Sequence, residues 1–140
     1  MSVAIKPLNL ADCEDLILLG GLGTLTTGGE DIMLRSVRNS VKVWSYWAEG
    51  VLVCIWGLIA PTLLSNEAYL WMFTTNQLHS HTFMFVRHSR LVTEEMLKHY
   101  PVIVGHCAIS ADKARRWIEW CGGKFGKPDG QLIPFEIRAA

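Results

Sequence analysis

The stretch EAYLWMFTTNQLHSHTFMFVRHSRLVTEEMLKHYPVIVGHCAISADKARRWIEWCGG, from Glu67 to Gly123, decides the fold. Its pattern predicts a strand (67–75), a loop (76–82), a long helix, a buried strand (102–109) and a short helix that is capped by Ser110 and has Arg115 on its outward face. Two strands joined by a helix of this length form a βαβ unit, with parallel strands and a right-handed crossover. The loop before the long helix suits an anionic ligand, because the first N–H groups of a helix have no partner inside it.

The residues on either side of this stretch predict further strands and helices. Before it we expect a strand (3–8), a helix capped by Asn9, a glycine-rich loop (20–29), a helix (30–39) and a hairpin (41–48 and 51–60) that turns at Glu49-Gly50. The second hairpin strand is continuously apolar, which predicts cover on both faces, and Gly57 within it marks a bulge or a close backbone approach. After the stretch, KFGKP and QLIPFEIR predict a closing hairpin with a turn at Asp129-Gly130.

The composition predicts one domain over residues 1–140 with a dense core or an apolar surface for a partner. Half of the 140 residues are hydrophobic, 19% are charged, and six are Trp. The net charge of zero gives no field that would draw the chain to nucleic acid or to an anionic membrane. The N-terminus lacks the pattern of a signal peptide, and the most apolar run, which contains Pro61, is too short to span a bilayer. We expect a soluble, intracellular protein.

The cysteines and histidines do not predict a metal centre. The four cysteines, none in a C-x-x-C motif, are expected to be buried reduced thiols: Cys13, Cys54, Cys107 and Cys121. His79 and His81 alone could chelate a transition metal weakly, but we favour a polar helix start with interfacial histidines.

The order of elements resembles the GNAT fold, that of a superfamily of N-acetyltransferases, over nearly the whole chain. Members carry Gln/Arg-x-x-Gly-x-Gly/Ala between their fourth strand and third helix, where this chain has Gln77-Leu78-His79-Ser80-His81-Thr82. The last helix, SADKARRWIEWCGGKF, is similar to the family pattern of a polar cap, a small residue and an aromatic turn leading to Gly and Phe. The resemblance implies an α/β (α+β) fold with a mixed central sheet of about six to seven strands and four flanking helices.

The resemblance also implies which residues hold acetyl-CoA and carry protons. In the family, loop glycines let backbone N–H groups close around the pyrophosphate of coenzyme A, whereas Ser80 and Thr82 would crowd it. Many members use a tyrosine to protonate the leaving thiolate, and the corresponding Ile118 cannot donate a proton. Glu67 matches the place of a general base in some members, although a solvent-facing strand end is the simpler interpretation. Tyr69 and His106 are other candidate proton carriers. The expected cofactor-binding residues are Met72, Phe73, Thr74, Gln77, Ser80 and Thr82.

A narrower resemblance is to small GNAT-like proteins of short-tailed bacteriophages, which share the chain length, the Gly-ending last helix and a closing F-x-I strand. It implies a phage protein with a degenerate acyl-CoA site that works through protein contacts in virion assembly, in the virion or the host cytoplasm. The alternative is an active acetyl-CoA-dependent N-acetyltransferase, with the cofactor between the strand ending at Met72-Phe73-Thr74 and the strand at 102–104. We favour the first, expect acetyl-CoA to bind weakly or not at all, and allow for a homo-oligomer.

Overall fold

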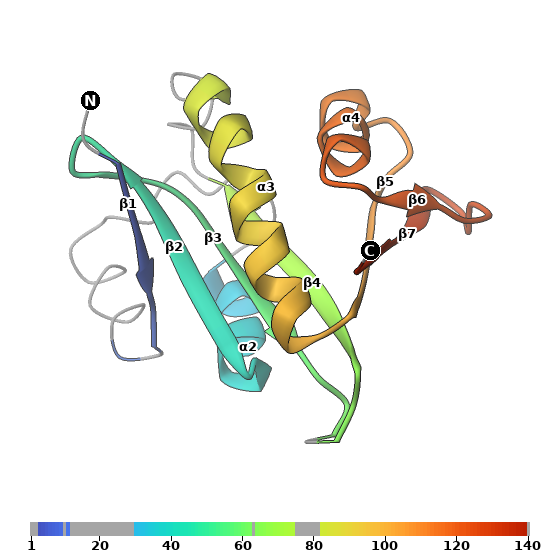
Figure 1. Cartoon of the computed structure of the whole chain (residues 1–140), viewed down its shortest axis with the longest axis horizontal. Coiled ribbons are helices and arrows are strands. Elements are labelled where there is room, and N and C mark those ends of the chain that lie inside the picture. Colours follow the sequence, from blue (N-terminus) through green and yellow to red (C-terminus); the bar gives the residue numbers. More distant parts are fainter. Residues whose placement is uncertain (1–2, 10, 12–29, 63, 75–81, 140) are drawn as a thin grey trace. The chain divides into compact units, whose positions relative to one another are not determined.

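A computed structural model describes residues 3–9, 11, 30–62, 64–74 and 82–139. These residues form a mixed α+β fold, as predicted (Figure 1). The elements are β1 (Val3–Pro7), α2 (Glu30–Asn39), β2 (Lys42–Ala48), β3 (Val51–Ile59), β4 (Glu67–Thr74), α3 (Thr82–His99), β5 (Val102–Ala108), α4 (Asp112–Trp120), β6 (Lys124–Phe125) and β7 (Leu132–Arg138). The predicted first helix, apart from Ala11, and the glycine-rich loop lie outside the described residues.

The seven strands are hydrogen-bonded in the order β1-β2-β3-β4-β5-β7-β6. β4 and β5 are parallel, as expected of the βαβ unit, whereas β1-β2, β2-β3, β5-β7 and β6-β7 are antiparallel. The chain divides into two compact units, residues 1–59 with 71–85 and residues 60–70 with 86–140. The prediction of a single domain stays a prediction.

In the first unit, the predicted β2–β3 hairpin forms the centre. Its turn places Glu49 and Gly50 at φ 52° and 80°, in the left-handed region that hairpin turns require. β3 is buried at every residue from Leu52 to Leu58, which confirms that both of its faces are covered. One face of the hairpin packs against the apolar side of α2 through Val37. On the opposite face, Tyr46 of β2 packs edge-on against Phe85, with the two ring centres 5.4 Å apart.

Gly57 marks a close approach, the second of its two predicted roles. A Cβ there would lie 2.4 Å from Cζ2 of Trp71, so only glycine leaves room for that ring. Trp71 is held in place because its Nε1 donates a 2.7 Å hydrogen bond to the Ser40 hydroxyl. The bulge of this hairpin lies elsewhere in β3, at Val53, because Tyr46 pairs with Cys54 and the next residue, Trp47, pairs with Leu52.

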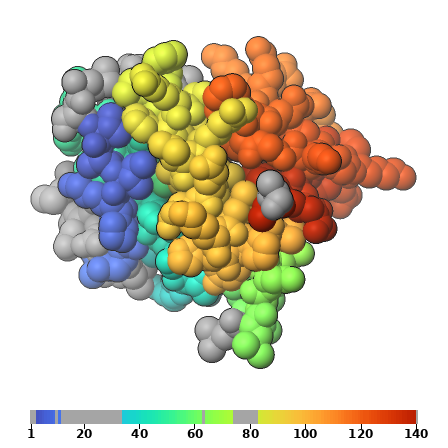
Figure 2. All heavy atoms as spheres, viewed as in Figure 1, coloured from blue at the N-terminus to red at the C-terminus, as the bar shows by residue number. Residues whose placement is uncertain are grey.

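The second unit is built on β5, which pairs with β7 over seven positions from Val102↔Arg138 to Ala108↔Leu132. The connection between β3 and β4, which belongs to this unit, lies at the surface (Figure 2), and Leu64 in it is 97% exposed. α3 contacts α4 through Arg90. The Arg90 guanidinium stacks 3.7 Å from the centre of the Trp120 ring, and its Nε donates a 3.0 Å hydrogen bond to the Trp120 carbonyl.

Three expectations for this unit were wrong. β5 is not buried throughout: Ile103 and Gly105 are buried, but His106 is exposed, because alternate residues of a strand face opposite sides and only one side is covered. Ser110 does not cap α4, whose N-cap position is Ala111 and has no side-chain cap. Arg115 does not face outward; it is half-buried, with its Nη1 donating to the Ile109 carbonyl at 3.2 Å.

The buried thiol of Cys54 makes the free energy of unfolding depend on pH. Cys54 is 0% exposed on β3, and burial raises the pKa of its thiol above the ordinary value of 9.0. Above pH 9.0 the unfolded chain loses this proton while the native state keeps it, so the free energy of unfolding falls as the pH rises, by about 1.4 kcal/mol per pH unit. Urea unfolding between about pH 8 and about pH 10.5 measures the slope. Cys54→Ala is expected to reduce the slope, to which Cys107 and Cys121 still contribute because burial raises the pKa of their thiols as well, and an equal slope in both proteins would contradict the assignment.

Candidate functional site

The candidate site starts where the parallel pairing of β4 with β5 ends. Among the described residues, this pairing covers three positions, from Glu67↔Val102 to Tyr69↔Val104. At the last of them, the Tyr69 hydroxyl and His106 Nδ1 lie 3.3 Å apart, within hydrogen-bond distance, with the two ring centres 5.8 Å apart. Both residues were predicted from the sequence as candidate proton carriers, but their contact with each other was not predicted. They meet because a parallel register brings residue 69 beside residue 104, on the face that residue 106 also shares.

The environment of this pair suits proton transfer. His106 is exposed, and Tyr69 is 37% exposed. Burial raises the pKa of Tyr69, so its hydroxyl keeps its proton at neutral pH. The tautomer of His106 decides which group donates: Nδ1–H can donate to Tyr69, which leaves Nε2 as an acceptor, or the tyrosine can donate to Nδ1.

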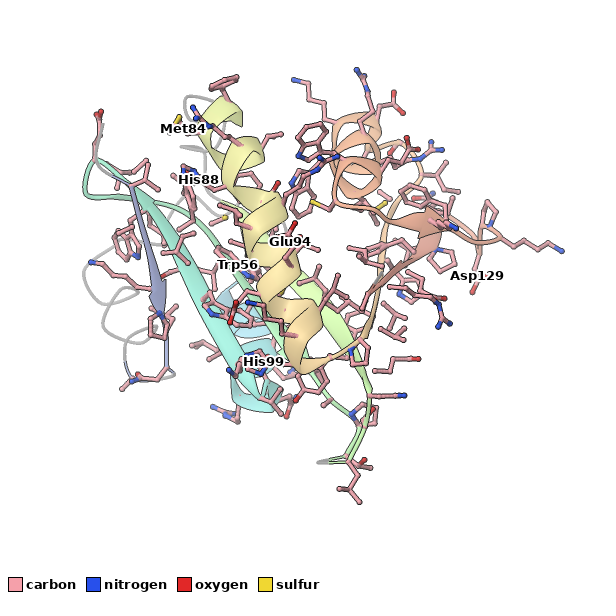
Figure 3. All side chains as sticks on the ribbon, viewed as in Figure 1. Trp56, Met84, His88, Glu94, His99 and Asp129 are labelled. Carbon is pink, nitrogen blue, oxygen red and sulfur yellow. The ribbon has the colours of Figure 1, made fainter. Side chains whose placement is uncertain are left out.

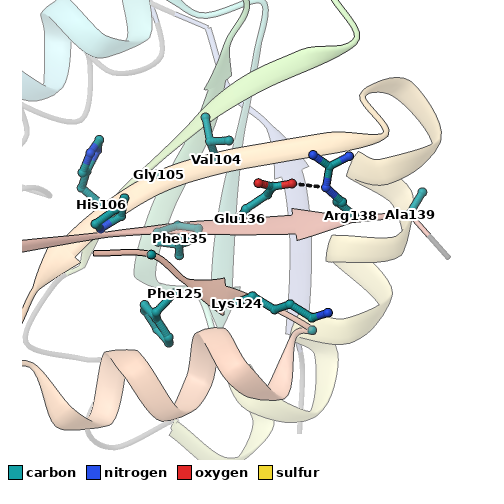
Figure 4. Close-up of a pocket in the computed structure, with 12 residues that line it drawn as sticks. Val104, Gly105, His106, Lys124, Phe125, Phe135, Glu136, Arg138 and Ala139 are labelled. Atoms are coloured by element: carbon teal, nitrogen blue, oxygen red, sulfur yellow. Dashed lines mark ion pairs between the residues drawn. The ribbon is translucent and has the colours of Figure 1, made fainter. Parts of the chain in front are cut away.

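His106 also lines a groove of about 770 Å³ on β5, β7 and β6 (Figure 4). Val104 and Pro134 line the groove beside His106. In the strand register, Pro134 is opposite His106, and Val104 is opposite Glu136. The other end of the groove is lined by three charged residues, Lys124, Glu136 and Arg138. Glu136 and Arg138 form an ion pair, and Lys124 is opposite Glu136 in the register. Sequence reasoning missed these three residues. The alternation in LIPFEIR, with polar groups at every second position, was the available signal.

Glu67, the predicted base, is the first residue of β4 and is exposed. It is opposite Val102, whereas the Tyr69–His106 pair lies at the other end of the paired stretch. The turn before it is fixed because the Ser65 hydroxyl donates to the Glu67 carbonyl at 2.8 Å and accepts from the Glu67 N–H at 3.1 Å. The role of Glu67 as a base stays a prediction.

The predicted cofactor-binding residues are placed only in part. Met72 is half-buried on β4, and the Phe73 side chain is buried in the cluster that contains Trp71. Thr74 ends β4, and Thr82 begins α3. Gln77 and Ser80 lie outside the described residues, as do His79 and His81.

Ile118, which the resemblance aligns with the proton-donating tyrosine of GNAT enzymes, is 4% exposed. Its packing under the end of α4 is tight, because a Cβ on Gly123 would lie 2.4 Å from Ile118 Cγ2. The position therefore belongs to the core of the second unit.

Metal ligands do not gather in the part of the chain that the structure describes: no group of three or more His, Cys, Asp or Glu residues there could hold an ion. His88 and His99 lie several turns apart on α3 (Figure 3). Of the helices within the described ranges, none is long and apolar enough to cross a membrane.

Known structures resemble the chain over nearly its full length. The ribosomal-protein-S18-alanine N-acetyltransferase of Escherichia coli matches with a TM-score of 0.73 and 11% identity, over 98% of this chain and 94% of that one. A Bacillus subtilis acetyltransferase in complex with CoA matches with a TM-score of 0.69 and 10% identity, over 99% and 100%. The chain has the GNAT fold. A dodecameric spermidine N-acetyltransferase of Vibrio cholerae also matches, with a TM-score of 0.67 and 13% identity, over 97% and 93%.

At these identities, the likeness establishes the fold alone. No protein-family model matches the sequence, and no curated protein does. The resemblance to phage proteins stays a prediction.

The buried position of Ile118 yields a prediction. Ile118→Tyr, which would put a tyrosine where the resemblance expects one, is expected to lower the free energy of unfolding by about 1–3 kcal/mol, because the larger ring does not fit beneath Gly123. Urea denaturation measures this, and Ile118→Val, with an expected loss of about 0.5–1.5 kcal/mol, is the small-side-chain control. A tyrosine variant as stable as the parent would show that residue 118 is not a core position.

Proposed function

We propose that the protein is an acyl-CoA-dependent N-acyltransferase in which His106 takes the proton of the acceptor amine. The contact between Tyr69 and His106, at the end of the β4–β5 pairing and at one end of the groove, carries this proposal. The fold supports it, since structures with the same fold include acetyltransferases in complex with CoA.

The described residues fit a coenzyme A site at two points. β4 continues beyond its last residue paired with β5, Tyr69, to Thr74, and the backbone of such a strand end can bond the amides of the pantetheine arm. α3 begins at Thr82 and has no acidic side chain in its first turn, so its positive N-terminal end would meet a phosphate without a repelling charge. We therefore propose the expected set as the cofactor-binding residues: Met72, Phe73, Thr74, Gln77, Ser80 and Thr82.

When bound, acetyl-CoA supplies the thioester that the amine attacks. In the proposed role, His106 Nδ1–H donates to the Tyr69 oxygen, and the lone pair on Nε2 accepts the proton of the attacking amine. The Tyr69 hydroxyl, which burial keeps protonated by raising its pKa, can give its proton to the leaving thiolate. This assigns to Tyr69 the task that Ile118 cannot perform. Proximity of amine and thioester supplies a further part of the rate.

Replacing each of the two candidate bases, His106 and Glu67, with glutamine tests which of them takes the proton of the amine. His106→Gln is expected to lower kcat by about 100-fold or more, because it removes the general base, whereas Glu67→Gln is expected to leave kcat within about threefold. The measurement is thiol release from acetyl-CoA, with mass spectrometry of the product, using the best acceptor from a screen of amines and peptides. Affinity for coenzyme A serves as the control and should not change in either variant. The opposite ranking would assign the base to Glu67.

A second candidate function follows from the two departures from the family pattern. Ile118 is buried, and Ser80 and Thr82 replace the loop glycines, as expected of a GNAT scaffold that has lost its chemistry. Such a protein would act through protein contacts, in phage virion assembly, and the exposed side chains of Leu91 and Leu132 are candidates for a binding surface. Binding of coenzyme A separates the two functions.

A further inference from the structure

The groove on β5, β7 and β6 has a different chemistry at each end. His106 lines one end, and Lys124, Glu136 and Arg138 lie at the other, as Figure 4 shows. The lining also has apolar groups at Pro134, opposite His106, and at Val104, opposite Glu136. A ligand that fits this groove therefore carries a group for each end and an apolar part between the two groups.

The charged end favours an anion. At neutral pH, Lys124 and Arg138 each carry a positive charge and Glu136 carries a negative one, which leaves one positive charge in excess. Glu136 is paired with Arg138, whereas Lys124 lies opposite this pair on the short strand β6. Lys124 is exposed, so its ammonium group can turn to a ligand carboxylate.

The register fixes the distance between the ends. Lys124 is level with Glu136, and Glu136 is level with Val104, two residues before His106 on β5. With the usual rise along a strand and the usual spacing between strands, the backbones of His106 and Lys124 lie about 12 Å apart. An extended peptide covers this distance with three to four residues, at about 3.3–3.6 Å each.

We propose that this groove binds the amino-terminal segment of a peptide or protein, with the free amine beside His106 and an acidic side chain at the third or fourth residue beside Lys124. The inference rests on the proposed function, because it names the acceptor of that acyl transfer. An apolar second residue would lie over Val104 and Pro134. The requirement for an anion at a set distance from the amine distinguishes this acceptor from a polyamine or a small uncharged amine.

Binding of a matched pair of peptides tests the groove without any turnover. Both peptides begin with alanine and leucine, are amidated and carry a fluorophore at the far end; one has glutamate at positions three and four, and the other has glutamine. Fluorescence anisotropy is expected to show tighter binding of the glutamate peptide by roughly three- to tenfold, decreasing with added salt. Equal binding of the two peptides would overturn the proposal.

Charge variants locate the effect. Lys124→Glu is expected to remove the preference for glutamate, and Lys113→Glu, the same change at an exposed residue of α4 outside the groove lining, is expected to keep it. Glu136→Gln should strengthen binding of the glutamate peptide, which no loss of folding would do. An equal effect of the two lysine variants would contradict the proposal, as would displacement of the peptide by coenzyme A, which would make the charged end a cofactor site.

Mass spectrometry of the same peptides with acetyl-CoA separates the inference from the proposed function. Charge-dependent binding without acetylation would leave the groove as a peptide site and refute the transferase. Acetylation of other amines, without a preference for the glutamate peptide, would support the transferase and refute the acceptor proposed here. Acetylation of the glutamate peptide in preference to the glutamine peptide is the result that both proposals expect.

Discussion

The three parallel pairs between β4 and β5 are the constraint on which the candidate site depends. They bring Tyr69 level with Val104, and the strand period then puts His106 on the same face, 3.3 Å from the tyrosine oxygen. The seven pairs between β5 and β7 extend this face to Glu136 and Arg138. A shift of one residue in either register would turn these side chains to the covered face, so the chemistry of the groove is a consequence of strand register.

Much of the fold could be predicted from the sequence because its signals are local. The β2–β3 hairpin follows from an apolar run and a turn at Glu49-Gly50, and α3 ends just before Tyr100-Pro101, as the restriction on residues before proline requires. The errors concern contacts between elements. Helical periodicity placed Arg115 on the solvent face, but the Ile109 carbonyl and the Phe125 ring cover it. Likewise, the Tyr69–His106 contact and the charged end of the groove join residues from separate strands, and no spacing within one sequence specifies such pairs.

The proposed transferase would use the GNAT fold with a different set of proton carriers. Ile118, which the resemblance aligns with a proton-donating tyrosine, is buried, and the proposed acid and base come from β4 and β5. Such a change is physically reasonable, because a fold supplies positions rather than particular residues, and any titratable pair at the end of the strands can serve. The proposed function depends most strongly on the loop that would hold the pyrophosphate. In that loop, Ser80 and Thr82 stand where the family pattern has glycines or alanine.

Calorimetric titration of the purified protein with coenzyme A and acetyl-coenzyme A tests the central claim most directly. The proposed transferase predicts saturable binding in the micromolar range, lost on Gln77→Ala at the first position of the loop motif that resembles the family's. An absence of heat and of any thermal shift at millimolar ligand would contradict it. The protein would then be a GNAT scaffold that acts through its surface.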